Sequence, residues 1–476
     1  MALNTGEAEH REKDFFGPSL NLVSRLLSAD EHAVFRRLGV FVGGWDLEAA
    51  SAVVETVSPG ADPLETMASL VDKGLVQAYE PSPGVPRFRL LETIREYAVE
   101  LLETNGELSD MWRRHALFYL AMAEEGEPKL HAGEQEEWLA RLERDHDNLR
   151  SALTWSQSGH GELEVGWRLG WALGWFWHLH GHYHEGRAWL EQMLETSRLV
   201  PPQDRARLMV RTGTLTYLQG DLARAELLLE NGIAISRAGG DIWTAALGLG
   251  VLGYVRLNQG RFRDSEASSA EALRLFESLA DRWGIAWAQH GLGRAAYDQG
   301  DYERASIHLE ESLATRRDLQ DIWGLSLGLH FVGRVAYARG ELERARALQE
   351  ESLGLAQRVA AKRYIAWTLQ HLGHIALASG EHMAAADFLR ESLASAMQRG
   401  DKLGVVDCIE SLGALAACQG RPQVAATLFG AGNTCGSTLR LERSFSASLS
   451  ITPASRSALA GAYKRRNRGH RPPPPP

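Results

Sequence analysis

Apolar and small residues recur along the middle of the chain with a period of 40 residues. Within one period, segments 284–300 and 302–319 carry apolar positions at helical spacing, for example Ile307, Leu309 and Leu313. Glycine holds one position in six successive periods, at Gly220, Gly260, Gly300, Gly340, Gly380 and Gly420. A second glycine series precedes it by seven residues (Gly213, Gly253, Gly293, Gly333, Gly373 and Gly413), and small residues follow it by five (Ala225, Ser265, Ala305, Ala345, Ala385 and Ala425). These registers indicate an array of repeated two-helix units.

Each period predicts two helices joined by a tight turn, which Gly300-Asp301 provides in the unit just described. Gly293 and Ala305 allow the two helices to approach closely, because neither has a large side chain. One hairpin cannot bury its apolar face alone, whereas stacked hairpins form a continuous core. We therefore expect a mainly α fold, with a right-handed α-solenoid of about seven hairpins over 163–436.

The segment before the array has a different pattern. Helical spacing is followed by two short strand-like runs and a closing helix, with the elements expected at 29–41, 47–57, 63–74, 74–80, 86–91 and 92–103. Three helices, a hairpin and a further helix predict a winged-helix domain at 29–110. A helical linker at 111–162 joins it to the array.

Specific strings in both regions resemble known families. The spacing of Leu292-Gly293, Gly300 and Ala305 resembles a tetratricopeptide repeat (TPR), with 40 residues per unit instead of the usual 34. The strings FRRLGVFVGGWDLEAA, SLVDKGLV and RFRLLETIREYAVELL resemble the winged helix that follows the NB-ARC ATPase in bacterial STAND regulators of the AfsR and MalT type (LuxR-family-like). WLARLERDHDNLRSAL, at 138–153, is similar to the helical linker of that family. The resemblance implies a sensor whose ligand binding releases an ATPase, and no such ATPase is visible here.

The two ends of the chain fall outside this pattern. Residues 5–27 resemble an internal piece of a class III nucleotidyl cyclase, and Asn21 and Arg25 match that family's transition-state-stabilising Asn-x-x-x-Arg pair. The segment is too short for the metal-binding carboxylates, so we interpret 1–28 as an inactive remnant. Residues 444–476 hold six Arg or Lys and no acid and end in five prolines, so we expect 437–476 to be a disordered basic tail.

Composition narrows the function classes. The 476 residues are 44% hydrophobic and 24% charged, which is ordinary for a globular protein. We find no run of 18 apolar residues, no apolar leader and only three cysteines, so we expect a cytoplasmic protein without a membrane partner. None of the six lysines follows a glycine, which excludes a P-loop.

Charge argues against nucleic acid. The net charge is −10, and residues 30–110 hold 15 acidic against 6 basic residues, a net of −9. The recognition-helix position carries Asp62, Glu65 and Asp72 beside a single Lys73. Phosphate contact requires the opposite sign, so we expect an intramolecular packing module.

We identify no catalytic motif, so the chain is not expected to be an enzyme or to hold a cofactor or metal. His178, His180, His182 and His184 alternate like metal ligands, but the turn at Gly181 predicts that they point in several directions. Cys408 and Cys418 are too far apart for a CxxC pair, and we interpret both as buried small hydrophobic residues.

The inner wall of the array is the candidate binding surface. Aromatic residues with interleaved Arg and His are expected there, at Tyr254, Trp287, His290, Arg294, Tyr297, His330, Arg334, Tyr337, Trp367, Gln370 and His374. Such side chains suit a peptide, a protein or a small inducer, although several could simply pack between helices. Trp243, Trp283 and Trp323 are interpreted as inter-repeat packing.

The sequence thus predicts a non-enzymatic scaffold, the sensor half of a bacterial signal-transduction or transcriptional regulator. Two alternatives stay open. One is a DNA-binding winged-helix transcription factor, and the other is an inactive fragment of a nucleotidyl cyclase or ATPase fusion.

Overall fold

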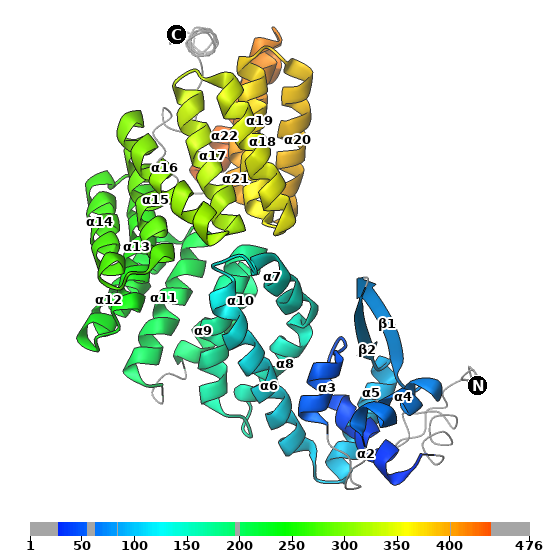
Figure 1. Cartoon of the computed structure of the whole chain (residues 1–476). Coiled ribbons are helices and arrows are strands. Elements are labelled where there is room, and N and C mark those ends of the chain that lie inside the picture. The colour runs from blue at the N-terminus through cyan, green and yellow to red at the C-terminus, as the bar shows by residue number, and fades with distance from the viewer. Residues whose placement is uncertain (1–26, 55–61, 83, 196–199, 400, 439–476) are drawn as a thin grey trace, which may run out of the picture. The chain divides into compact units, whose positions relative to one another are not determined.

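The computed structural model describes residues 27–54, 62–82, 84–195, 200–399 and 401–438. The described chain is mainly α-helical, with a winged helix followed by stacked helical hairpins (Figure 1). It divides into two compact units. The first comprises Met1–Lys129, Glu137–Phe176 and Ala188–Leu208, and the second comprises Leu130–Glu136, Trp177–Arg187 and Met209–Pro476. No helix among the described residues is long and apolar enough to cross a membrane.

The winged helix lies in the first unit and has the expected order of elements. They are α2 (Ala29–Arg37), the 3₁₀ turn η1 (Leu38–Val40), α3 (Leu47–Val53), α4 (Pro63–Asp72), β1 (Gln77–Ser82), β2 (Val85–Arg89) and α5 (Glu92–Thr104). The strands pair antiparallel, and Phe35, Leu70 and Leu102 are fully buried in the core. The first helix is shorter than expected, because the chain tightens into the 3₁₀ turn after Arg37.

Glu31 on α2 ties this helix to α4. Ser28 caps α2 through its hydroxyl, which accepts a hydrogen bond from the Glu31 N–H, and Glu31 accepts one in return from the Ser28 N–H. The same carboxylate accepts hydrogen bonds from Ser69 (2.7 Å) and from Lys73. Burial opposes its ionisation, but these hydrogen bonds prevail and lower the pKa of Glu31 to about 2.

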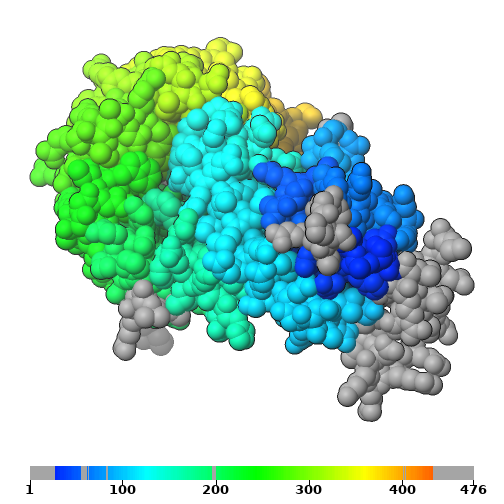
Figure 2. Space-filling model, turned by 60° about the horizontal axis from the view of Figure 1, so that its bottom comes forward, coloured from blue at the N-terminus to red at the C-terminus, as the bar shows by residue number. Residues whose placement is uncertain are grey.

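A buried ion pair joins the hairpin to the linker helices α6 (Leu108–Lys129), α7 (Gln135–Arg144) and α8 (His146–Ser156). Arg87 on β2 is 2% exposed and donates two hydrogen bonds to Asp145, at 2.9 and 2.8 Å. It also donates to the Gly44 carbonyl, which accepts a further hydrogen bond from Asn148. The string at 138–153 that resembles the family's helical linker spans two helices, α7 and α8, which meet at Asp145. The linker lies directly against the winged helix (Figure 2).

Helical hairpins fill the rest of the described chain. Their helices are α9 (Leu163–His180), α10 (Tyr183–Glu195), α11 (Pro202–Leu218), α12 (Leu222–Ala238), α13 (Ile242–Asn258), α14 (Phe262–Ser278), α15 (Arg282–Asp298), α16 (Tyr302–Leu319), α17 (Ile322–Ala338), α18 (Leu342–Arg358), α19 (Lys362–Ala378), α20 (His382–Gln398), α21 (Lys402–Cys418) and α22 (Pro422–Thr438). Paired in order, they make the seven hairpins expected from the 40-residue period.

The two glycine series that recur every 40 residues have different structural roles. Gly300 ends the turn between α15 and α16 with a φ of +81°, a left-handed conformation that side chains disfavour. Gly293 lies where these helices cross, and a Cβ there would be 2.6 Å from Leu309 Cγ and 3.1 Å from the Leu309 backbone nitrogen. The hairpin is therefore closed by a contact that only glycine permits.

Helices α13, α15, α17, α19 and α21 form what we call the inner layer. Each packs on its hairpin partner and on the hairpin before it, and each of the first four also packs on the next inner-layer helix. Burial follows from this: 14 of the 17 residues of α17 are buried, against four in its partner α18. The inner layer is thus the core of the second unit (Figure 1).

Replacing Gly293 by Ala should destabilise the array by about 1–3 kcal/mol, because the new methyl group overpacks Leu309. Gly354 on α18 is the matched control, since a Cβ there meets nothing within 4 Å. Gly354→Ala should stabilise by about 0.5–1 kcal/mol through helix propensity. Urea unfolding gives the free energy of unfolding of both variants. Equal changes in this free energy would show that the contact between Gly293 and Leu309 does not limit how closely the two helices pack.

Candidate functional site

Tryptophans link successive repeats through the inner layer. Trp243 stacks on Trp283 with ring centroids 6.5 Å apart, and Trp287 lies between Trp283 and Trp323 at 5.7 and 5.8 Å. The ring planes differ by only 17° to 22°, and Trp323 then meets Tyr364 edge-on. The interpretation of the phase-repeating tryptophans as inter-repeat packing is confirmed, and Trp287 joins that stack.

A second line of polar and aromatic side chains runs beside the tryptophans. The hydroxyl of Tyr254 and Nδ1 of His290 share a hydrogen bond of 2.7 Å, and the His290 ring meets Phe331 edge-on. Gln349 reaches in from α18, where its Nε2 donates to the His330 carbonyl and its Oε1 lies 3.0 Å from the His330 Nδ1. These residues bind one another across neighbouring helices.

The structure divides the eleven sequence-based candidates into two groups. Six are less than 9% exposed and serve packing: Tyr254, Trp287, His290, Tyr297, His330 and Tyr337. Five are partly buried and keep some surface: Arg294, Arg334, Trp367, Gln370 and His374. A ligand-binding role for any of them stays a prediction, and the partly buried group is where a ligand could make contact.

Two arginines face the same aromatic ring from neighbouring helices. The guanidinium carbon of Arg294 lies 4.8 Å from the Phe331 ring centroid, and that of Arg334 lies 5.1 Å from it. Arg334 also lies 4.6 Å from the Tyr297 ring. Arg294 has a carboxylate partner in Asp298 at 3.5 Å, whereas no described residue forms an ion pair with Arg334. The pair of helices α15 and α17 therefore carries an excess of positive charge at this point.

The histidines around these arginines are held neutral. Burial, together with the positive charge of Arg334, lowers the pKa of His330 to about 3 and that of His374 to about 4. The pKa of His371 is lowered well below its ordinary value for the same two reasons. Neutral imidazoles can both donate and accept, and His374 uses Nε2 to share a 2.8 Å hydrogen bond with Ser411.

Sequence reasoning missed two contributors to this region. Phe331 occupies the same repeat position as Gly291 and His371, so the 40-residue phase could have indicated it. Gln135 comes from outside the array and has no repeat signal, yet its buried side chain contacts α17 within the second unit. A contact between segments so far apart in sequence leaves no periodic trace.

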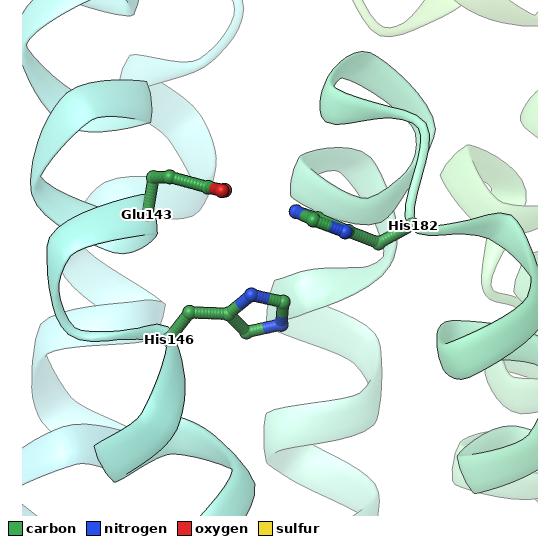
Figure 3. Close-up of side chains that lie close together, drawn as sticks. All are labelled: Glu143, His146 and His182. Atoms are coloured by element: carbon green, nitrogen blue, oxygen red, sulfur yellow. The ribbon is translucent and has the colours of Figure 1, made fainter. Parts of the chain in front are cut away.

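The alternating histidines do point in different directions. His178 is buried with its ring edge-on to Trp323, while His184 shares a hydrogen bond with Gln219. His182, Glu143 and His146, which Figure 3 labels, are side chains of the types that bind metal ions. His182 belongs to the second unit, whereas Glu143 and His146 belong to the first. We assign no metal site to residues of different units.

The two cysteines differ from each other. Cys408 is buried as expected, and burial raises the pKa of its thiol to about 11. The expectation for Cys418 was wrong: it is exposed, because it is the last residue of α21 before the turn at Gly420. Asn21 and Arg25 lie outside the described residues, as does the chain from 439 onward.

A hollow of about 410 Å³ lies in the first unit, which sequence reasoning did not anticipate. Two tryptophans and several charged residues line it: Glu124, Glu164, Trp167, Arg168, Trp171, Pro201, Asp204 and Arg207. Its charges are paired internally, since Arg168 donates to both oxygens of Glu124 at 2.7 and 2.8 Å and Arg207 lies 3.5 Å from Asp204. Both arginines of the hollow are thus paired, and its three carboxylates leave a net charge of −1.

Comparison with known families agrees with the fold. A family model described as a winged helix-turn-helix domain matches residues 27–103, and two tetratricopeptide repeat models match 244–318 and 329–360. The chain is 37% identical over 183 residues to the "Putative HTH-type transcriptional regulator Rv0890c" of Mycobacterium tuberculosis. That alignment covers 38% of this chain and 20% of the relative, so the chain matches about a fifth of the relative's length.

Solved structures that align with this chain share little sequence identity with it. A STAND protein with a tetratricopeptide repeat sensor from Pyrococcus horikoshii aligns at a TM-score of 0.47 and 14% identity, over 90% of this chain and 66% of that one. NprR in complex with its cognate peptide NprX aligns at 0.48 and 15%, over 70% and 98%. A Rap protein complexed with competence and sporulation factor aligns at 0.49 and 13%, over 74% and 99%.

The neutral histidines predict a stability that falls on acidification. The unfolded chain takes up protons below about pH 6.5, whereas folded His330 and His374 bind them only near pH 3 and 4. The unfolded state therefore binds more protons between pH 6.5 and 4, and each such histidine costs up to about 1.4 kcal/mol per pH unit there. Urea unfolding at pH 7.5, 6 and 5 measures this slope. His374→Gln should make it shallower, and an unchanged slope would contradict the assignment.

Proposed function

We propose that this chain is a non-enzymatic scaffold, the sensor part of a bacterial signal-transduction or transcriptional regulator, which binds a peptide or protein on the inner layer. The observation that carries the proposal is Arg334, a partly buried guanidinium stacked on Tyr297 and Phe331 without a carboxylate partner among the described residues. Its Nε is buried and makes no hydrogen bond. A carboxylate supplied by a ligand would neutralise this guanidinium, which no carboxylate of the described residues pairs with.

Neighbouring residues support recognition of a polypeptide. Trp367 and Gln370 on α19 are partly buried, and the Trp367 ring stacks at 6.3 Å on His330, which lies one turn before Arg334. An arginine and an aromatic side chain beside a well-packed core are typical of the residues that dominate binding energy at protein interfaces. Backbone carbonyls and acidic side chains of a polypeptide would both suit the excess positive charge.

The proposal assigns no catalytic step. The buried thiol of Cys408 has a raised pKa of about 11, so almost none of it is thiolate near neutral pH. His330 and His374 have pKa values near 3 and 4 and are already committed to hydrogen bonds within the array. A thiol with a raised pKa is a weak nucleophile near neutral pH, and a histidine with a lowered pKa is a weak general base.

Replacing Arg334 by Gln should reduce ligand capture at least tenfold while the chain keeps its fold. The experiment is a pull-down from bacterial lysate with the full chain as bait, read by mass spectrometry. Arg390→Gln is the matched control, because Arg390 lies on α20 with two thirds of its side chain exposed and pairs only with Asp387 among the described residues. A partner retained by the wild type and Arg390→Gln but lost by folded Arg334→Gln supports the proposal. Equal retention by all three chains contradicts it.

The match to a winged helix-turn-helix domain favours a second candidate, DNA binding. The charges of this domain oppose it. Lys73 is bound by Glu31, Arg87 by Asp145, and both Arg36 and Arg37 pair with Glu107. With most of its cations paired internally and Arg89 as the exposed exception, the domain is better suited to pack on the linker than to contact phosphates.

A mobility shift with a labelled random-sequence DNA duplex tests this role of the domain. We expect no complex at micromolar protein in either 50 or 200 mM salt, because few basic side chains are free to displace counterions. A complex at 50 mM that weakens by orders of magnitude at 200 mM would instead establish phosphate contacts and revive the DNA-binding candidate.

A further inference from the structure

A short segment outside the repeats is bound to the array within the second unit. Leu130–Glu136 precedes and begins α7, and Gln135 within it is fully buried. The Gln135 Oε1 accepts a 2.7 Å hydrogen bond from the backbone N–H of Trp323, and its Nε2 donates to Asp321 Oδ1 at 3.1 Å. Nε2 also donates to the Leu130 carbonyl, which closes the segment on itself. We call Leu130–Glu136 the strap.

The array presents a built site to this glutamine. Asp321 is the N-cap of α17 and is fully buried, and its carboxylate accepts a hydrogen bond from the Gly324 N–H and pairs with buried Arg316 at 3.3 Å. A carboxylate oxygen beside a backbone N–H is the complement of a primary amide, which offers donors and an acceptor together.

The preceding repeat shows why the site is open to a second segment. At the start of α15, Asp281 accepts hydrogen bonds from the N–H groups of both Trp283 and Gly284, at 3.1 Å each. At the start of α17, the only described backbone N–H that donates to the Asp321 carboxylate is that of Gly324, and the N–H of Trp323 has its acceptor in Gln135. Because the first amides of a helix have no acceptor within it, this N–H depends on the strap.

Other strap positions contact the array in the manner of a bound peptide. The His131 ring lies 4.2 Å from the Trp283 ring, and Glu136 accepts a 2.9 Å hydrogen bond from Arg358. Gly133 lies so close to Gln320 that a Cβ would be 2.6 Å from its Oε1. Four of the seven strap residues thus contact side chains or backbone from two successive hairpins, α15–α16 and α17–α18.

We propose that the N-terminal end of α17 is a carboxamide-reading site, which Gln135 occupies as an internal ligand. A polypeptide that presents glutamine followed by an acidic residue can exchange with the strap. The acidic residue takes the place of Glu136 beside Arg358. This site is separate from Arg334, so it does not depend on the proposed function of the inner layer.

Amide hydrogen exchange in the full chain tests the site directly, because the Trp323 N–H reports on its occupant. Exchange at Trp323 should be at least tenfold faster in Gln135→Ala than in the wild type, with global unfolding little changed. Glu137→Gln, at an exposed neighbouring position, is the matched control and should exchange like the wild type. Equal Trp323 exchange in Gln135→Ala and wild type would overturn the role of Gln135.

Exchange of the strap needs a peptide in trans. The probe is the synthetic peptide LHAGEQE, added at millimolar concentration to Gln135→Ala. It should restore protection of Trp323, whereas LHAGEAE should not. Restoration by neither peptide would overturn an exchangeable site, and equal restoration by both would overturn reading of the amide.

A disulfide between the strap and the array provides a second test of whether a peptide can replace the strap. The Cβ of residue 133 would lie about 3.4 Å from the Cβ of Gln320, close to the ordinary span of a disulfide. Gly133→Cys combined with Gln320→Cys, with Cys418 and Cys435 replaced by Ser, should hold the strap in place when oxidised. Fluorescent LHAGEQE should then bind only after reduction. Equal binding in both states would show that the peptide does not replace the strap.

Discussion

The array depends on one steric constraint, the approach of the two helices of each hairpin to a distance that only glycine allows. Gly213, Gly293 and Gly373 each face a leucine of the partner helix, with 2.6 to 2.8 Å left for a Cβ. Because the partner helix lies so close on one side, the inner-layer helix can reach both neighbouring hairpins on its other sides. Its burial and the stacking of tryptophans between repeats both follow from this approach.

Two repeats keep this close approach but place a polar side chain where the others have an apolar one, which brings polar groups into the core. Gly253 faces Ser269 and Gly333 faces Gln349 in place of leucine. The longer of these, Gln349, extends past Gly333 and hydrogen-bonds both the carbonyl and the ring of His330. The Gln349 oxygen by itself favours a protonated ring, but burial and the positive charge of Arg334 outweigh it, so His330 stays neutral beside the arginines. Positive charge in the inner layer is therefore carried by its arginines, Arg294 and Arg334 among them.

The sequence carries the repeat because both glycine series are fixed by local geometry. A left-handed turn at Gly300 and a close contact at Gly293 recur wherever the hairpin recurs, so the hairpins could be predicted from spacing alone. How deeply each candidate side chain is buried could not be predicted from that spacing. Phase places Trp287 on the inner layer, but only the actual spacing of the repeats shows that its ring fills the gap between Trp283 and Trp323. The contacts of Arg87 and Gln135 join segments without a common period, and pattern analysis has no access to them.

Helix α17 unites these features. Its N-terminus is bound by Gln135, its second residue belongs to the tryptophan stack, and its last turns carry Arg334. At about 1.5 Å per residue, its 17 residues extend about 26 Å, and nearly all of them are buried in the inner layer. A helix packed on all sides moves as a body if it moves at all, because a dense core has discrete packings and does not deform continuously. Any energetic coupling between the carboxamide site and the inner-layer arginine would therefore have to come from a change in how this one helix packs.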